Sequence, residues 1–274
     1  MRSQKILLTI IYTLCLVPLF SHKTMGQGFS VSPSRLSFTG NPGETVAQTI
    51  TLSNTSQTIL TFSTRIQDFD RDSLGNKIYY DPGTRPSSNA KWLTMSSTSL
   101  RLLPGENKKL NISMAIPADS KKITQSMIFF TQVKEAAATG SVVKSIGVSI
   151  LMEMGVQVYF TPNGLNAGEL EFLAFEDRGT VGTGKEQMRK LMIKIHNNGE
   201  INKDAFVRLE LTNKETGEEH KIDPASIALL PNATQWVTFN LPIKLTGKFL
   251  AVALLDAGAA YDLKIAEKEI IYRP

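Results

Sequence analysis

Hydrophobic and polar side chains alternate along SIGVSILMEMGVQVYFTP, the segment of residues 145–162. A period of two is typical of a β-strand, whose successive side chains point to opposite faces. One face carries only large apolar side chains, those of Val148, Ile150, Met152, Met154, Val156 and Val158. The other face carries Ser149, Glu153, Gly155 and Gln157, with Leu151 as its apolar exception. The pattern leaves two interpretations open: a strand packed in the core, or a strand whose apolar face binds another protein.

The same alternation, rich in β-branched and aromatic residues, recurs through the first half of the chain. It predicts strands over 46–54, 59–69, 108–116 and 126–133 and in the opening segment before them, separated by turn sequences such as Asn41-Pro42-Gly43 and Pro104-Gly105. Helical periodicity is missing between residues 28 and 162. Roughly seven short strands at this spacing predict an immunoglobulin-like β-sandwich.

The second half repeats this scheme. Strands are predicted over 168–176, 187–197, 204–213, 236–242, 248–256 and 263–272. Two stretches of the first half have echoes here, in the same order: ITLSN (50–54) resembles IKIHN (193–197), and LLPGENKKLNISMAIP (102–117) resembles LLPNATQWVTFNLP (229–242). We therefore expect an all-β chain with two immunoglobulin-like β-sandwich domains in tandem, over 27–162 and 163–274, joined near Thr161-Pro162-Asn163-Gly164.

The first 26 residues have the pattern of a signal peptide. Arg2 and Lys5 precede an apolar run from Ile6 to Phe20, which is too short to cross a bilayer comfortably. An uncleaved membrane anchor is the alternative. Cleavage would remove Cys15, the single cysteine, so the mature chain would have no disulfide and no thiol nucleophile.

The charge of the chain excludes one class of partner. The formal net charge is +5, and loss of the three basic residues of the signal, Arg2, Lys5 and Lys23, leaves about +2. No run of five like charges occurs, so nothing in the sequence indicates binding to nucleic acid.

Two motifs come close to known ligand sites and fall short. Residues 179–186, GTVGTGKE, resemble a phosphate-binding loop, but Glu186 replaces the hydroxyl residue that binds magnesium, so a hairpin loop is the better interpretation. Asp68, Asp70 and Asp72 are spaced like calcium ligands, but Ser73 and Tyr79 stand where that loop needs glycine and glutamate. A solvated hairpin tip is favoured there, and weak calcium binding stays open.

No catalytic arrangement can be built from the two remaining histidines, His196 and His220. We expect a protein that is not an enzyme and needs no cofactor or metal.

Four motifs, in the same order, make residues 28–162 similar to the N-terminal domain of the periplasmic pilus chaperones, the PapD-like family. They are Ser34–Phe38, which includes Arg35; Leu103-Pro104-Gly105-Glu106 with the following strand and Ile116-Pro117; Ser126–Phe130; and Val156–Pro162. The last resembles the end of the family's seventh strand, in which an alternating apolar run contains a lysine and leads through two aromatic residues to arginine and proline.

The resemblance implies a function for the segment 145–162. In the family, the seventh strand completes a pilus subunit that lacks one strand, a form of β-strand addition called donor-strand complementation. The donor side chains here would be Val148, Ile150, Met152 and Met154. The family also uses an arginine, here Arg35, and a lysine, here replaced by Gln157, to anchor the C-terminal carboxylate of the subunit. A second departure is Gln125, where the family has an acid, and a third is Thr161 in place of arginine; together they remove a charged link between the domains.

These implications make the first functional hypothesis a periplasmic chaperone of fimbrial or surface-fibre subunits. The identity of the subunit and the participation of an outer-membrane usher stay open, as does a self-dimer through the donor strand. The alternative hypothesis is a structural or adhesive envelope protein that uses the same two sandwiches as a permanent scaffold.

Overall fold

The structure is a computed structural model that describes residues 28–133 and 151–273. These residues form strands and loops, with two single-turn 3-10 helices at Ala90–Trp92 and Gly184–Glu186 and no α-helix among them. Within the same ranges, no helix is long and apolar enough to cross a membrane. The predicted signal peptide, together with Val148 and Ile150, lies outside the described residues. The all-β prediction is confirmed.

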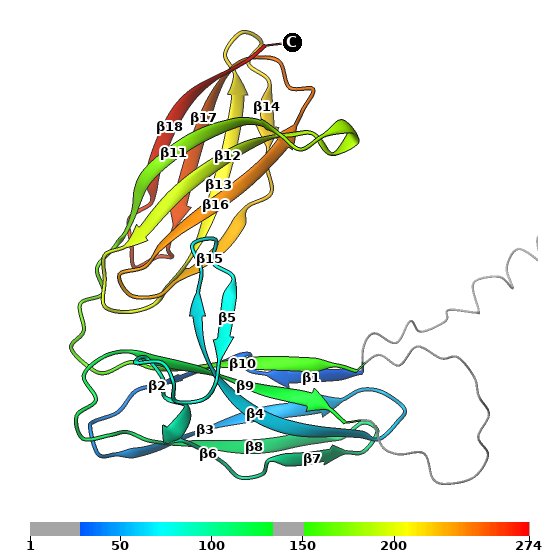
Figure 1. The fold of residues 1–274 in the computed structure, drawn as a ribbon, viewed down its shortest axis with the longest axis vertical. Helices are drawn as coiled ribbons and strands as arrows, with labels where there is room; N and C mark the ends of the chain where they lie inside the picture. Colours follow the sequence, from blue (N-terminus) through cyan, green and yellow to red (C-terminus); the bar gives the residue numbers. More distant parts are fainter. Residues whose placement is uncertain (1–27, 134–150, 274) are drawn as a thin grey trace, which may run out of the picture.

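Two sheets pack face to face in the first half of the chain (Figure 1). One has the order β1 (Phe29–Ser32), β3 (Thr45–Asn54), β8 (Asn107–Ala115), β6 (Leu93–Met95). The other has the order β2 (Arg35–Phe38), β10 (Glu153–Phe160), β9 (Thr124–Gln132), β4 (Leu60–Arg71), β5 (Lys77–Tyr80), with β7 (Ser99–Leu102) also paired to β4. The chain passes from β1 in the first sheet to β2 in the second across the cis peptide bond Ser32–Pro33.

The second half builds another two-sheet sandwich, which rises from one end of the first in Figure 1. Its smaller sheet has the order β11 (Leu170–Val181), β12 (Met188–Asn197), β16 (Thr234–Pro242). Its larger sheet has the order β14 (Glu219–Lys221), β13 (Lys203–Asn213), β17 (Gly247–Asp256), β18 (Lys264–Tyr272), with β15 (Ala225–Leu229) also paired to β13. Each sandwich encloses its own apolar core, so the prediction of two β-sandwiches in tandem is confirmed.

The two sequence echoes correspond to one repeated structural device. The buried side-chain amide of Asn54, at the end of β3, donates to the carbonyl oxygens of Thr58, Leu102 and Leu103 at 2.8, 3.2 and 3.0 Å. In the second sandwich Asn197, at the end of β12, donates in the same way to Ile201, Leu229 and Leu230 at 2.8, 3.5 and 3.0 Å. In each domain, therefore, the asparagine of the first echo holds the Leu-Leu-Pro turn of the second.

The long strands predicted from the sequence are present in the structure. The structure differs from the prediction in the length of some strands and in several short strands that were not predicted. The strand predicted over 168–176 continues to Val181 as β11, because it pairs with β12 as far as Met188 across a hairpin. That hairpin contains most of the sequence GTVGTGKE, so the prediction of a hairpin loop is confirmed. Five strands of three to five residues, β5, β6, β7, β14 and β15, were not predicted. Such short segments are too brief to display an alternating pattern.

Two kinds of contact join the sandwiches in addition to the linker itself and to an ion pair described below. The hairpin between β4 and β5 rises beside the second sandwich (Figure 1), and the carbonyl oxygen of Ser73 at its tip accepts the N–H of Trp236 at 2.7 Å. At the junction, Leu165 and Leu230 pack against an apolar cluster of the first domain formed by Phe69, Ile123, Met127, Phe129 and Tyr159. The linker between β10 and β11 is thus reinforced by contacts on two sides.

Candidate functional site

In the part of the chain that the structure describes, the first half of β10 has a partner strand on one side only. Its antiparallel neighbour β9 pairs along the full strand, from Glu153 to Phe160. Its parallel neighbour β2 pairs only from Gln157 to Phe160, because β2 begins at Arg35 and the preceding strand β1 belongs to the other sheet. Among the described residues, no strand pairs with 153–156 on this second side. This stretch is the open edge of β10.

The direction of the main-chain hydrogen bonds shows which groups this edge presents. The carbonyl oxygen of Met152 accepts the N–H of Gln132 at the end of β9, whereas the N–H of Gln157 donates to Ser34 on the opposite side. Main-chain groups alternate in direction along a strand, so those of Leu151, Glu153 and Gly155 point to the open edge. An unpaired row of N–H and C=O groups is a template for an additional strand.

The apolar face of β10 changes from core to margin along the strand. Val156 and Val158 are 1% and 0% exposed and belong to the core of the first sandwich. Met154 and Met152 are half-buried and pack against the margin of the same core. The core-strand interpretation therefore holds for Val156 and Val158. Met152 and Met154, two of the predicted donor side chains, lie on the same face of the strand but outside its fully buried part. Leu151, on the other face, is 52% exposed.

Glu153, on the polar face of β10, binds side chains of the neighbouring strand β9 and of β4, the next strand of the sheet. Its carboxylate pairs with the Arg65 guanidinium at 2.9 Å and accepts a hydrogen bond from the hydroxyl of Thr131 on β9. Arg65 in turn lies 4.0 Å from the centre of the Phe129 ring. These contacts hold the edge in place from its polar face, opposite to the face that carries the methionines.

Arg35 and Gln157 are direct neighbours in the parallel pair of β2 and β10. Both line a cleft of about 700 Å³ between the domains, together with Arg71 of β4 and residues of the second sandwich that include Asp204, Phe206 and Asp256. The structure thus brings together the two residues predicted to anchor a carboxylate. It adds Arg71, Asp204 and Phe206, for which the sequence analysis has no signal.

The Arg35 guanidinium is engaged with a carboxylate of the chain itself. One of its terminal nitrogens pairs with Asp204 Oδ2, and the other donates to Oδ1 at 3.2 Å. This two-point pairing is the main cause that raises the pKa of Arg35 above its usual value, against an opposing effect of burial. The two side chains are 30% and 51% exposed, and ion pairs this open to solvent contribute about 0–1 kcal/mol. Arg35 therefore has the geometry to bind a carboxylate, and it holds its present partner weakly.

Gln157 is oriented by the neighbouring Tyr159. The Tyr159 hydroxyl donates to Gln157 Oε1 at 3.0 Å, which leaves the amide NH₂ of Gln157 as the donor group of that side chain. Burial raises the pKa of the Tyr159 hydroxyl, and the charges of Arg71 and Arg35 oppose that rise. The hydroxyl therefore stays protonated at neutral pH. Gln157 supplies a hydrogen-bond donor where the family has a charge.

The three aspartates with calcium-like spacing do not form one site. Asp68 is buried and accepts the N–H groups of Thr84 and Arg85 at 2.9 and 3.0 Å. Asp70 pairs with the Arg85 guanidinium at 2.6 Å, and Asp72 caps the hairpin tip by accepting the N–H groups of Leu74 and Asn76. Among the described residues, no three acidic, histidine or cysteine side chains are placed to hold a metal ion. Hairpin geometry accounts for the spacing of these carboxylates.

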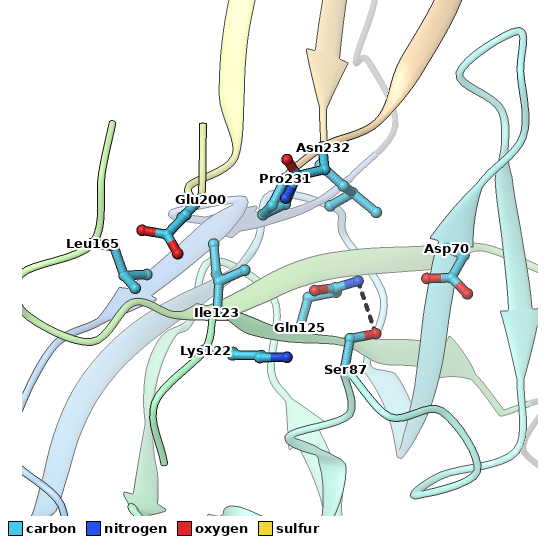
Figure 2. Close-up of a pocket in the computed structure, with 10 residues that line it drawn as sticks. Asp70, Ser87, Lys122, Ile123, Gln125, Leu165, Glu200, Pro231 and Asn232 are labelled. Carbon is cyan, nitrogen blue, oxygen red and sulfur yellow. Dashed lines mark hydrogen bonds between the residues drawn. The ribbon is translucent and has the colours of Figure 1, made fainter. Parts of the chain in front are cut away.

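A second pocket, of about 410 Å³, lies at the domain junction (Figure 2) and has no lining residue in common with the first. Gln125 stands on its first-domain wall and donates to the Ser87 hydroxyl at 3.2 Å and to the carbonyl of Phe69 at 3.3 Å. Both partners belong to its own domain. Gln125 therefore makes no contact between the domains through these hydrogen bonds, in line with the predicted loss of a charged link at this position. The ion pair of Arg35 with Asp204 connects the domains at a different place.

Comparison with protein-family models finds no match to this chain, and neither does comparison with curated protein sequences. Solved structures of pilus chaperones are similar in fold over about 88% of the chain. They include the chaperone–tip subunit complex CsuC–CsuE of the archaic Csu pili of Acinetobacter baumannii (16% identity, 88% of this chain and 98% of that chain, TM-score 0.49). The E. coli chaperone DraB (15%, 88% and 98%, 0.43) and the Pseudomonas aeruginosa chaperone CupB2 (12%, 87% and 99%, 0.44) are further examples. Identities this low do not indicate which residues bind a partner, so the function must be argued from the residues of this chain.

Proposed function

We propose that this protein is a periplasmic chaperone that caps fimbrial or surface-fibre subunits by lending them its β10 strand. The observation that carries the proposal is the open edge of β10, where main-chain groups without a partner strand in the described part of the chain lie beside a methionine-lined extension of the core. A subunit that lacks one strand needs both features, since main-chain bonds close its edge and apolar side chains fill its groove.

The side chains of this edge suit a groove that varies in shape. Met152 and Met154 are unbranched and adaptable, and they would act together with Val148 and Ile150, which precede the described part of the strand. Four such side chains, at about 1.5–3 kcal/mol each, would contribute roughly 6–12 kcal/mol before the costs of association and ordering are subtracted. Gln157 lies on the same strand and Arg35 lies beside it on β2, where they would bind the terminal carboxylate of the subunit and fix its register.

The proposal includes export by the N-terminal signal and requires neither catalysis nor a cofactor. An outer-membrane usher would be the receiver of the subunit. A second copy of the chain is the competing occupant of the open edge, and it would appear as a dimer in sedimentation of the purified protein.

The test is capture of the fimbrial-type subunits encoded beside the gene, co-expressed with the protein in a bacterial periplasm. Wild type and Leu151→Asp should copurify with a subunit, because Leu151 points away from the apolar face. Met152→Asp should lose at least nine-tenths of it while keeping the melting temperature of the Leu151→Asp control. If both variants retain the subunit, β10 is not the donor; if the folded wild type captures none, the scaffold alternative replaces the proposal.

A further inference from the structure

The cleft between the domains contains more binding chemistry than Arg35 and Gln157 provide. Arg71, the last residue of β4, lines the same cleft, and its Nη1 donates to the carbonyl of Gly75 at 2.8 Å. Its Nε is buried and has no hydrogen-bond partner among the described residues. An unpaired, buried N–H of a guanidinium is costly, and a carboxylate oxygen is the partner that would satisfy it best.

Positive charge is concentrated on the first-domain wall of this cleft, which Arg35 and Arg71 line, and beside it at Lys77. Lys77 lies directly opposite Arg71 in the pair of β4 and β5. Burial lowers the pKa of Lys77, and repulsion from Arg71 and then from Arg35 lowers it further, so the three cations lie close enough to interact. The acids of the cleft belong to the other wall, where Asp256 is already engaged by the N–H of Gly258 at 3.0 Å. Asp204 is thus the acid that reaches across to the cations.

The second-domain wall offers an apolar platform next to that acid. Phe206 stands two residues after Asp204 on β13, on the same outward face, and is 56% exposed. Its strand neighbours Ser226 and Asp256 also line the cleft, so its ring faces the space between the domains. An aromatic side chain this exposed, in the same cleft as a guanidinium that binds in two-point fashion, combines an apolar contact with a carboxylate site.

Anchoring of the client carboxylate belongs to the function proposed above. We propose in addition that Asp204 occupies Arg35 as an internal substitute until the client carboxylate displaces it. Arg71 then supplies a second charge to that carboxylate, and Phe206 packs against an apolar final side chain of the client. This inference rests on the proposed function and names residues that the family resemblance does not supply. Arg71 provides the second charge that Gln157 lacks. Asp204 is half-exposed, so it returns to water at little cost when it is displaced, and the Ser73–Trp236 contact and the junction cluster continue to hold the domains together.

The experiment measures binding of three synthetic decapeptides by NMR titration of the full mature chain. Two end in phenylalanine, one with a free carboxylate and one amidated, and the third ends in serine with a free carboxylate. We expect the phenylalanine peptide with a free carboxylate to bind at least tenfold more tightly than the amidated one and to shift the Arg71 Nε–H signal. Arg71→Gln should weaken binding at least fivefold, and Phe206→Ser should remove the preference for phenylalanine over a final serine. Asp204→Asn should tighten binding at least threefold, because it removes the competitor. Arg208→Gln, on the same face of β13 but outside the cleft, should change nothing.

Equal binding of the amidated peptide would overturn the inference, and so would an unchanged affinity of Asp204→Asn. The Asp204→Asn result is a gain of affinity, so loss of folding cannot imitate it. Met152→Asp should bind the peptide like wild type, which separates this site from the donor strand. If subunit capture depends on Met152 but the peptide does not bind the cleft, the chaperone function stands and the cleft inference is wrong.

Discussion

Ser73 and Trp236 join the two domains through a single main-chain hydrogen bond of 2.7 Å, made at the tip of the hairpin between β4 and β5. Beside it, Gln235 Nε2 reaches the carbonyl of Leu74 at 3.4 Å. The hairpin is an extension of the first sandwich, so the protection of these hydrogen bonds from exchange measures the strength of the contact between the domains.

Gly75 is the residue of this tip that cannot be enlarged without cost. Its φ is +85°, and a Cβ placed there would lie 2.2 Å from Gln235 Nε2. Gly75→Val should therefore push the tip from the second domain, and hydrogen exchange of the Trp236 amide should accelerate at least tenfold. Gly105→Val is the control, because Gly105 has a φ of +76° with no atom within 4 Å of its Cβ position. Equal exchange in the two variants would show that the tip does not depend on Gly75.

The two buried asparagines should each be essential to one domain. Asn54→Leu leaves the carbonyls of Thr58, Leu102 and Leu103 without their donor, and we expect a loss of about 2–4 kcal/mol in the unfolding free energy of the first domain. Asn197→Leu should act equally on the second domain. Chemical denaturation followed by domain-specific NMR signals measures both. Asn107→Leu, at an exposed position of β8, should change stability by less than about 0.5 kcal/mol.

Two residues on the same face of the donor segment should separate folding from binding. Val156→Asp places a charge in the core and should destabilise the first domain by about 3 kcal/mol or more, seen as a lower melting temperature. Met152→Asp lies at the margin of that core and should change the melting temperature by only a few degrees, while it abolishes capture of a subunit. A Met152→Asp protein as unstable as Val156→Asp would place Met152 in the core.

The hairpin tip should weaken in acid. Hydrogen bonding, first from the Asn76 side chain, lowers the pKa of Asp72 from its usual 3.8. A carboxyl group whose pKa is lowered by folding stabilises the folded state above its unfolded pKa and loses that effect as the pH falls through the folded value. Asp72→Asn should therefore be less stable than wild type at pH 7, and the difference should shrink by pH 3. Asp119→Asn, at an exposed loop position, is the control; a difference independent of pH would exclude the charge as its cause.

The fold was largely predictable because most of its strands show a local alternation of apolar and polar residues. Long alternating strands such as β3 and β13 are recognisable from a period of two, and the echoes around Asn54 and Asn197 mark two copies of one domain. The sequence resemblance between ITLSN and IKIHN has a physical cause, since each asparagine binds the same turn in its own sandwich.

The candidate site was predictable only in part. Arg35 and Gln157 were expected near each other, because the family resemblance makes both of them anchors of one carboxylate, and the structure places them side by side on β2 and β10. Asp204 is separated from Arg35 by 169 residues and belongs to the other domain, so no spacing connects them. Arg71 ends a strand whose aspartates resembled a calcium loop, and its place in the cleft depends on how the hairpin bends toward the second sandwich. Contacts between domains depend on their relative placement, which alternation within a strand does not encode.

A partner strand bound to the open edge of β10 would stabilise the first domain and not the second. A partner that binds only the folded edge adds RT ln(1 + [L]/Kd) to the unfolding free energy of the domain that carries it, about 2.7 kcal/mol at a hundredfold excess over Kd. The second domain, with its own core, gains little from this term. Heating in the presence of the partner should then raise the transition of the first domain and leave that of the second almost unchanged, so calorimetry would measure the occupancy of the edge from the size of that shift.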